Sequence, residues 1–209
     1  MNVKTNTEHF TDEEIKNNHE AFLKRMAHYK KHGMNQALLR ESIIRQIDHE
    51  SSSILEIGTG KGYLTALLSR HYDRIVSVDT SDEDLRTAMI NASQSGGTHK
   101  INFITADAGS LDFGDRSFDV VVSAFTFHHL DLPFKVLREM IRLADKQIII
   151  SDFSPRGFNA VEQVHRQEGS THEKKPVDFD IIGVYLKEFN FDVRLIEDEW
   201  QTIYSARRR

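Results

Sequence analysis

The chain of 209 residues contains no cysteine. That absence excludes disulfides, cysteine zinc sites and thiol nucleophiles, and it agrees with a cytoplasmic location. Positive charge is also scarce, because 27 lysines and arginines face 32 aspartates and glutamates, for a net charge of −5. Non-specific binding to phosphate backbones needs clustered lysine and arginine, so the composition disfavours it as the main activity.

Long apolar runs are missing as well. The first residues, Met1–Asn6, contain no apolar core of the signal-peptide kind, and no segment approaches the length that spans a membrane. A chain of 209 residues fits a single structural domain that buries its own core. We expect residues 51–209 to form the main body and residues 1–50 to add helices to it.

Two helices are predicted in that first part. Thr11 and Glu14 form a capping box that begins a helix, and Gly33 ends it. A second apolar periodicity runs from about Gln36 through Ile47. The first helix is either a packed support or a lid over a ligand site, and its place before the next strand is the only basis for the lid.

The most informative stretch is Ser53–Thr65. Ile54, Leu55 and Ile57 form a short apolar run that suits a buried strand, and three glycines at alternate positions end that run. Leucines at helical spacing follow the last glycine. Glycine tolerates positive φ and lets a ligand approach the backbone amides, so this strand–turn–helix junction predicts a ligand site.

The glycine spacing separates several classes of ligand. A dinucleotide fingerprint needs its third glycine where Tyr63 stands, which disfavours a nicotinamide oxidoreductase. A phosphate loop fails too, because no Gly-Lys-Ser or Gly-Lys-Thr follows. A glycine-rich connection in another kind of α/β domain stays open. Asp79 ends the next predicted strand, roughly twenty residues after the glycines, which is where a ribose-binding acid is expected.

Further strands alternate with helices and predict a parallel sheet with right-handed crossovers. They are expected at residues 74–79, 101–105, 118–124 and 148–152. Residues 191–196 and 202–206 are joined by so short a link that they must form an antiparallel hairpin.

Several separated motifs resemble the class I S-adenosylmethionine-dependent methyltransferases, in their small-molecule branch (methyltransferase type 11, ubiquinone-biosynthesis-like). They are Ile54–Thr65, Val76–Ser81, Thr105–Ala108, and Asp115–Val122 followed by Phe127–Leu130. The resemblance covers roughly Ser53 to Asp152. It implies a Rossmann-like α/β fold, with a seven-stranded, mostly parallel sheet, one antiparallel strand and helices on both faces.

The resemblance also implies S-adenosylmethionine as cofactor, no metal, and a small-molecule methyl acceptor. The methionine end of S-adenosylmethionine would be lined by Glu56, Gly58 and Gly60, and Asp79 would accept hydrogen bonds from its ribose hydroxyls. Asp107 would hold the adenine amino group, the Ala108 amide would lie nearby, and Ser123 would flank the methionine part. The remaining residues assigned to the cofactor site are Thr59, Gly62 and Thr80.

One departure from the family pattern stands out. The family's Lys-Pro-Gly-Gly turn is replaced by Leu143–Gln147, which leaves the shape of that loop open. The glycine stretch also resembles the ribosomal RNA adenine dimethylases. Enzymes of that kind carry Asn or Asp, Pro, Pro and an aromatic residue after strand four, where this chain has Ser123–Thr126. An RNA or protein substrate is therefore the second alternative, behind a module that binds the cofactor without catalysis.

Candidate catalytic residues follow the fourth strand. His128 or His129 would take a proton from the acceptor, because histidine titrates near neutral pH; the alternative is that the pair only packs and caps. The phenylalanines Phe125, Phe127, Phe153 and Phe158 favour an apolar or planar acceptor, although they could belong to the core. A group of His165, Glu168 and His172 is interpreted as a solvated helix end, because helical spacing does not bring all three to one face.

Overall fold

The structure is a computed structural model, and it describes residues 2–4, 9–169, 171, 175 and 177–209. Its strands are β1 (Asn2–Lys4), β2 (Ile54–Ile57), β3 (Ile75–Asp79), β4 (Ile101–Thr105), β5 (Phe118–Ala124), β6 (Ala144–Phe153), β7 (Phe191–Glu197) and β8 (Gln201–Arg208). Its α-helices are α1 (Asp12–Lys31), α2 (Gln36–Ile44), α3 (Tyr63–Leu68), α4 (Asp82–Gln94), α5 (Pro133–Leu143), α6 (Pro155–Gln167) and α7 (Asp180–Glu188). Two 3-10 helices complete the order: η1 (Thr98–Lys100) and η2 (Phe127–His129).

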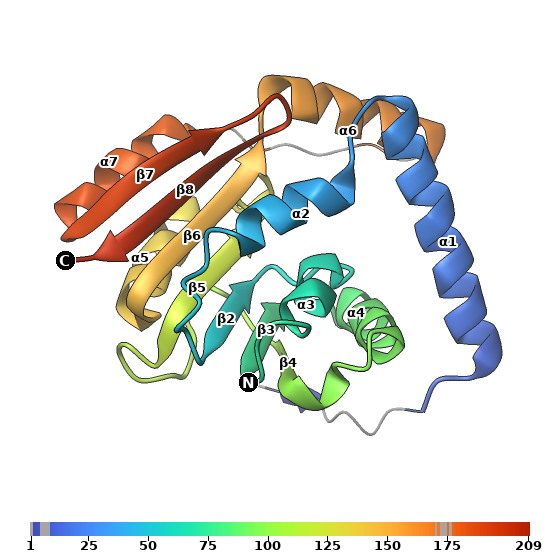
Figure 1. The fold of residues 1–209 in the computed structure, drawn as a ribbon, viewed down its shortest axis with the longest axis horizontal. Coiled ribbons are helices and arrows are strands. Elements are labelled where there is room, and N and C mark those ends of the chain that lie inside the picture. The colour runs from blue at the N-terminus through green and yellow to red at the C-terminus, as the bar shows by residue number, and fades with distance from the viewer. Residues whose placement is uncertain (1, 5–8, 170, 172–174, 176) are drawn as a thin grey trace.

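The strands form one twisted sheet in the order β1-β4-β3-β2-β5-β6-β8-β7 (Figure 1). The strands from β4 to β6 run parallel, and β8 lies antiparallel between β6 and β7. This confirms the predicted seven-stranded sheet with one antiparallel strand. The eighth strand, β1, pairs antiparallel with β4 at the sheet edge and was not predicted. Three residues are too few to show a period-two pattern, so the sequence gives no signal for it.

Helices cover both faces of the sheet. One apolar cluster joins the strands to α5 and α7 through residues such as Leu137 and Leu186. The other joins them to α2, α3 and α4 through residues such as Ile43, Leu64 and Leu85. A third, smaller cluster lies outside the sheet, where Tyr29 of α1 packs against α6. Figure 1 shows α1 running along one side of the molecule, from the neighbourhood of α6 to that of α4.

The predicted helix boundaries hold closely at the amino terminus. Thr11 caps α1, and its hydroxyl and the Glu14 side chain complete the capping box. The replacement of the family's turn has a simple outcome, because α5 ends at Leu143 and β6 begins at Ala144 with no loop between them. The guanidinium of Arg208 donates to the carbonyls of Ile141 and Ala144 and so stabilises this junction.

Candidate functional site

The glycine loop follows β2 at the carboxyl end of the sheet. Gly58 has a φ of +81° and Gly62 a φ of +72°, a region that side chains rarely adopt. A Cβ at Gly58 would lie 2.2 Å from Thr126 Oγ1, and one at Gly62 would lie 2.5 Å from the Cβ of Ala88. Both positions therefore require glycine for conformation and for space, and the loop fits closely between β5 and α4.

Asp79 joins the end of β3 to this loop. Its Oδ2 accepts the backbone N–H of Gly60 over 2.7 Å, and its Oδ1 accepts the N–H of Ser81 over 3.0 Å. A carboxylate has several acceptor positions, so these two bonds leave capacity for a ligand. Asp79 thus lies beside the glycine loop, as the sequence predicts for an acid at the end of this strand.

Glu56 is the buried acid of the loop. The residue is only 2% exposed, and its Oε2 accepts hydrogen bonds from the hydroxyls of Thr65 and Ser77. Burial raises the pKa of Glu56 from 4.5 to about 7, although the two hydroxyls and the charge of Arg40 oppose that shift. The acid therefore titrates near neutral pH, and a cation nearby would favour its charged form.

A cavity of about 540 Å³ opens on the glycine loop. This volume suits a cofactor or small-molecule site. Of the residues assigned from the sequence, nine line it: Glu56, Gly58, Thr59, Gly60, Asp79, Thr80, Ala108, His128 and His129. The predicted site is thereby brought together from β2, β3 and the segments after β4 and β5, although the role of each residue stays a prediction.

Three assigned residues do not line the cavity. Gly62 is the N-cap residue of α3 and lies against Ala88. Ser123 is fully buried within β5, and its hydroxyl donates to the carbonyl of Ile57. Asp107 has a side chain 65% exposed, and it pairs with Lys135 over 2.9 Å, which together with the Gly109 N–H lowers its pKa. Ser123 and Gly62 thus make their contacts within the fold, and Asp107 pairs with a lysine.

His128 is held firmly by the end of β6. Its Nδ1 lies 2.6 Å from Asp152 Oδ1, and its backbone N–H donates to Asp152 Oδ2 over 3.0 Å. Because a carboxylate accepts hydrogen bonds, Nδ1 carries the proton of the neutral ring and Nε2 carries the lone pair. His128 is 2% exposed, whereas His129 is exposed. Asp152 was expected only as the end of a strand, and no pattern in the sequence pairs it with His128.

The four phenylalanines divide between the cavity and the core. Phe125 and Phe153 line the cavity, where their rings stack with centroids 4.3 Å apart. Phe125 has a φ of +56°, a strained conformation for an aromatic residue. Phe127 is fully buried in the sheet core, so its place in the acceptor group is wrong. Phe158 packs edge-on against His128, with ring centroids 5.0 Å apart.

Five residues of α1 and α2 line the cavity although no pattern in the sequence marks them as site residues. They are Arg25, Met26, Tyr29, Gln36 and Arg40. His165 of α6 also lines the cavity, and its Nε2 accepts from Arg25 over 3.1 Å, so the solvated helix end is wrong for this residue. Glu168 pairs with Arg25 over 3.4 Å, and His172 lies outside the described residues. Within the described ranges, no group of three histidine, aspartate or glutamate side chains could hold a metal ion.

Comparison with known proteins agrees with this geometry. Residues 55–150 match the family model of a methyltransferase domain. The segment from β2 to β6 is therefore similar to methyltransferase domains. A malonyl-(acyl-carrier protein) O-methyltransferase of Anoxybacillus flavithermus is 28% identical over 141 residues, which cover 66% of this chain and 53% of that relative. A ubiquinone/menaquinone biosynthesis C-methyltransferase of Idiomarina loihiensis is 30% identical over 117 residues, which cover 54% of this chain and 47% of the relative.

The chain thus spans about half the length of these curated relatives. Among solved structures, the chain is similar to the magnesium protoporphyrin IX methyltransferase of Synechocystis, which contains bound S-adenosylhomocysteine. That similarity has a TM-score of 0.63 at 16% identity and covers 99% of this chain and 90% of the other. At such low identity the similarity shows the fold alone. None of the helices in the described part of the chain is long and apolar enough to cross a membrane.

Proposed function

We propose that this protein binds S-adenosylmethionine and transfers its methyl group to a small-molecule acceptor. The observation that carries the proposal is the meeting of the glycine loop, Glu56 and Asp79 around one cavity at the carboxyl ends of adjacent parallel strands. Ligands of open α/β sheets bind at this edge. The two curated relatives are named as O- and C-methyltransferases, which supports methyl transfer to a small or carrier-bound acceptor.

The cofactor, when bound, supplies a methyl group already activated by a sulfonium. The protein then has to orient the acceptor and exclude water. The stacked rings of Phe125 and Phe153 offer an apolar, flat surface for an acceptor on one side of the cavity. Tyr29 and Val161 from the cluster between α1 and α6 extend that apolar wall. These contacts favour a planar or apolar acceptor.

His128 is the proposed base, which would take a proton from a methyl acceptor that has to lose one. Asp152 fixes its ring so that the lone pair is on Nε2, and the residue lines the cavity. The alternative is that the Asp152–His128 pair only ties η2 to β6. His128→Asn tests this. If His128 is the base, its loss should lower turnover and change the pH profile of turnover, while the affinity for the cofactor stays unchanged. His129→Asn tests the other candidate base, which is exposed, and His71→Asn is the control, because His71 is an exposed histidine that is not among the cavity-lining residues.

The cofactor assignment is tested by calorimetric titration with S-adenosylmethionine and, separately, with NAD. We expect binding of the first only, and a loss of about tenfold or more in Asp79→Ala. Asp73→Ala is the matched control, because Asp73 is an exposed acid near the other end of β3 that pairs with Lys100. If folded protein binds NAD, or neither compound, the cofactor assignment is wrong.

A non-catalytic cofactor-binding module is the first alternative, and a methyltransferase of RNA or protein is the second. Release of S-adenosylhomocysteine during incubation with small planar acceptors separates the proposal from the first. Methyl incorporation into RNA or protein instead would favour the second. The cytoplasmic location expected from the sequence stays a prediction.

We also propose that α1 acts as a lid over the cavity. One end is held on α4 by Glu14 with Arg86 and by Asn18 with Asn91. The other end is held near α6 through Arg25, and Tyr29 is the only residue of α1 that is buried. Polar contacts exchange for water at low cost, so they suit an element that opens.

A further inference from the structure

The strand β7 lies at one edge of the sheet (Figure 1). All seven of its residues pair antiparallel with β8 in a continuous register, and no other strand in the described part of the chain pairs with it. The N–H and C=O groups of β7 that point away from β8 therefore have no partner strand, and such an edge is a template for one.

The sequence of β7 lacks the features that keep an edge strand from pairing. Residues 191–197 contain no proline and no lysine, and the pairing with β8 has no bulge, whereas the pairing of β5 with β6 has a register shift. Leu195 adds an apolar side chain that is 47% exposed. Edge strands that stay in water are normally protected by charge, proline or a bulge, so β7 fits an edge that a partner covers.

Two charges of opposite sign mark one face of β7. Asp192 and Arg194 are two residues apart, so their side chains leave the strand on the same face, and both residues are exposed. Neither side chain has a hydrogen bond or an ion pair with another residue in the described ranges. The residue opposite Asp192 on β8 is Arg207, which pairs instead with Asp48 over 3.0 Å. Asp192 and Arg194 therefore keep their charges available to a partner.

A second copy of this strand supplies the complementary charges. When two identical strands pair antiparallel around a two-fold axis perpendicular to the sheet, the axis passes through one residue and its own copy. An axis at Val193 places Asp192 opposite Arg194 of the second copy, and the reverse. An axis at Asp192 or at Arg194 would place like charges opposite each other, and an axis at Leu195 would place Asp192 opposite Asp198. Like charges in these positions destabilise the pair, so the sequence selects one register.

We propose that two copies of this chain associate through β7, with Val193 on the two-fold axis, and so join their sheets into one. Each Asp192 then forms a cross-strand pair with Arg194 of the other copy, and the exposed Leu195 lies opposite the buried Phe191. The hydrogen bonds between the strands use the groups that the edge leaves unpaired. No residue of β7 lines the cavity on the glycine loop, so this association does not depend on the proposed function.

Sedimentation equilibrium of the full chain, from low micromolar to millimolar concentration, tests the association. We expect wild type to change from monomer to dimer within this range. Arg194→Asp places two acids opposite each other in both cross-strand pairs and should raise the dissociation constant at least about tenfold. In the double variant Asp192→Arg with Arg194→Asp, the two charges exchange places. Its dissociation constant should return to within about threefold of wild type.

Arg70→Asp is the matched control, because Arg70 is an exposed arginine that follows α3, and the variant makes the same change in net charge. It should leave the dissociation constant within about twofold of wild type. Urea denaturation checks that each variant is folded. A wild type that stays monomeric over the whole range overturns the inference. A dimer that Arg194→Asp does not weaken, or a double variant that dimerises no better than Arg194→Asp, overturns it as well.

Discussion

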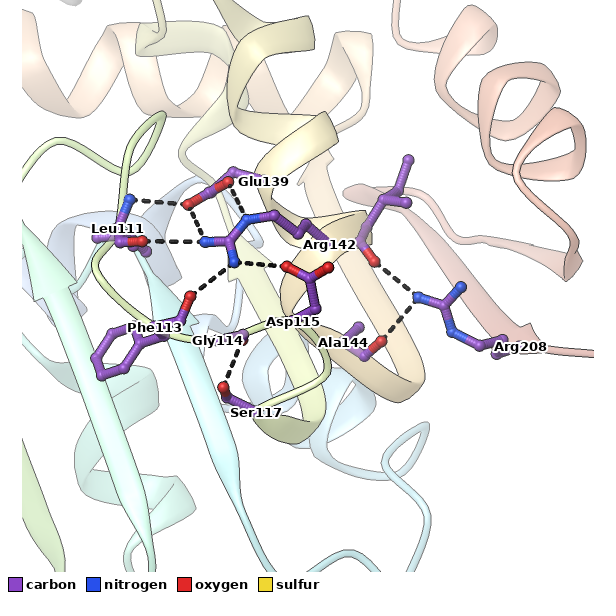
Figure 2. A network of polar contacts seen from close by, with 10 residues as sticks. Leu111, Phe113, Gly114, Asp115, Ser117, Glu139, Arg142, Ala144 and Arg208 are labelled. Carbon is purple, nitrogen blue, oxygen red and sulfur yellow. Dashed lines mark hydrogen bonds and ion pairs between the residues drawn. The ribbon is translucent and has the colours of Figure 1, made fainter.

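Two arginines at opposite ends of the parallel strands show how the same side chain serves different purposes. Arg142 lies at the amino ends of β5 and β6, and its guanidinium makes five hydrogen bonds to side chains and carbonyls of the surrounding segments (Figure 2). Its partners are Leu111, Phe113, Asp115 and Glu139. Arg40 lies at the carboxyl ends, and among the residues that the structure describes it donates only to Gln36.

The difference separates stabilisation from recognition. The bonds of Arg142 hold the segment before β5 against α5, and Glu139 and Asp115 raise its pKa. Its donors are used within the fold, so little remains for a ligand. Arg40 uses only Nη1 for its hydrogen bonds with Gln36, and no acid in the part of the chain that the structure describes forms an ion pair with it. An arginine whose N–H donors are all used within the fold is therefore expected to contribute to stability, and one with donors left over is expected to contribute to binding.

The largest effect that tests this comparison is on stability. Arg142→Met removes five hydrogen bonds. The Phe113 carbonyl and Asp115 lose the guanidinium, whereas the Leu111 carbonyl keeps the N–H of Phe113 and Glu139 keeps the N–H of Leu111. We expect the free energy of unfolding to fall by about 3 kcal/mol, measured by urea denaturation. Arg40→Met should cost less than about 1 kcal/mol, because it removes a charge that the fold does not pair. Equal losses would contradict the comparison.

The second prediction concerns the pH dependence of stability at Glu56. Arg40 and Asp79 are the charged groups acting on it, and Thr65 and Ser77 donate to it. Because its pKa rises from 4.5 to about 7 on folding, the folded protein keeps a proton that the unfolded chain releases between these values. This stabilisation is fully present below pH 4.5 and is lost as the pH rises through about 7.

The expected size is about 3 kcal/mol across that range in the absence of nucleoside. Glu56→Gln keeps an acceptor for both hydroxyls and does not titrate. It should therefore match wild type near pH 5 and be more stable near pH 8, in urea denaturation at each pH. If the stability difference between the two proteins does not change with pH, Glu56 does not titrate in this range.

The two ends of the cavity also differ in how well the sequence predicts them. The glycine loop and Asp79 come from one βαβ unit, so their local spacing was enough to predict a site. Arg40, Tyr29 and His165 come from three separate helices, and helical periodicity does not tell which polar residue faces a cavity. Phe127 was misplaced for a related reason, because an aromatic residue after a strand can turn into the core or away from it.

The third prediction uses two glycines of one loop. Gly58→Ala places a Cβ 2.2 Å from Thr126 Oγ1 at a φ of +81°, so strain and overlap add. Gly60 has a φ of +49°, but a Cβ added there would meet no atom within 4 Å, so Gly60→Ala introduces only backbone strain. We expect losses of about 2 and about 1 kcal/mol in urea denaturation. A larger loss of stability in Gly60→Ala than in Gly58→Ala would mean that close packing against Thr126 does not set the cost of a side chain in this loop.

The smallest stability effect, and the one that tests the lid, is expected at Asn18. Its Nδ2 donates to Asn91 over 2.7 Å, and Asn91 donates in turn to the carbonyl of Lys61 over 2.7 Å. This chain of bonds links α1 to the glycine loop through α4. Asn18→Ala should lower stability by about 1 kcal/mol or less, because the bond is partly exposed to water.

Its kinetic effect should be clearer, because a weakened lid releases a bound molecule sooner. In stopped-flow measurements with S-adenosylhomocysteine, we expect Asn18→Ala to raise the dissociation rate several-fold with little change in association. Asn17→Ala is the matched control, since Asn17 is the preceding, exposed residue of α1. Equal dissociation rates in the two variants would make α1 a support, because the contact that joins it to the glycine loop would then have no part in retaining the ligand.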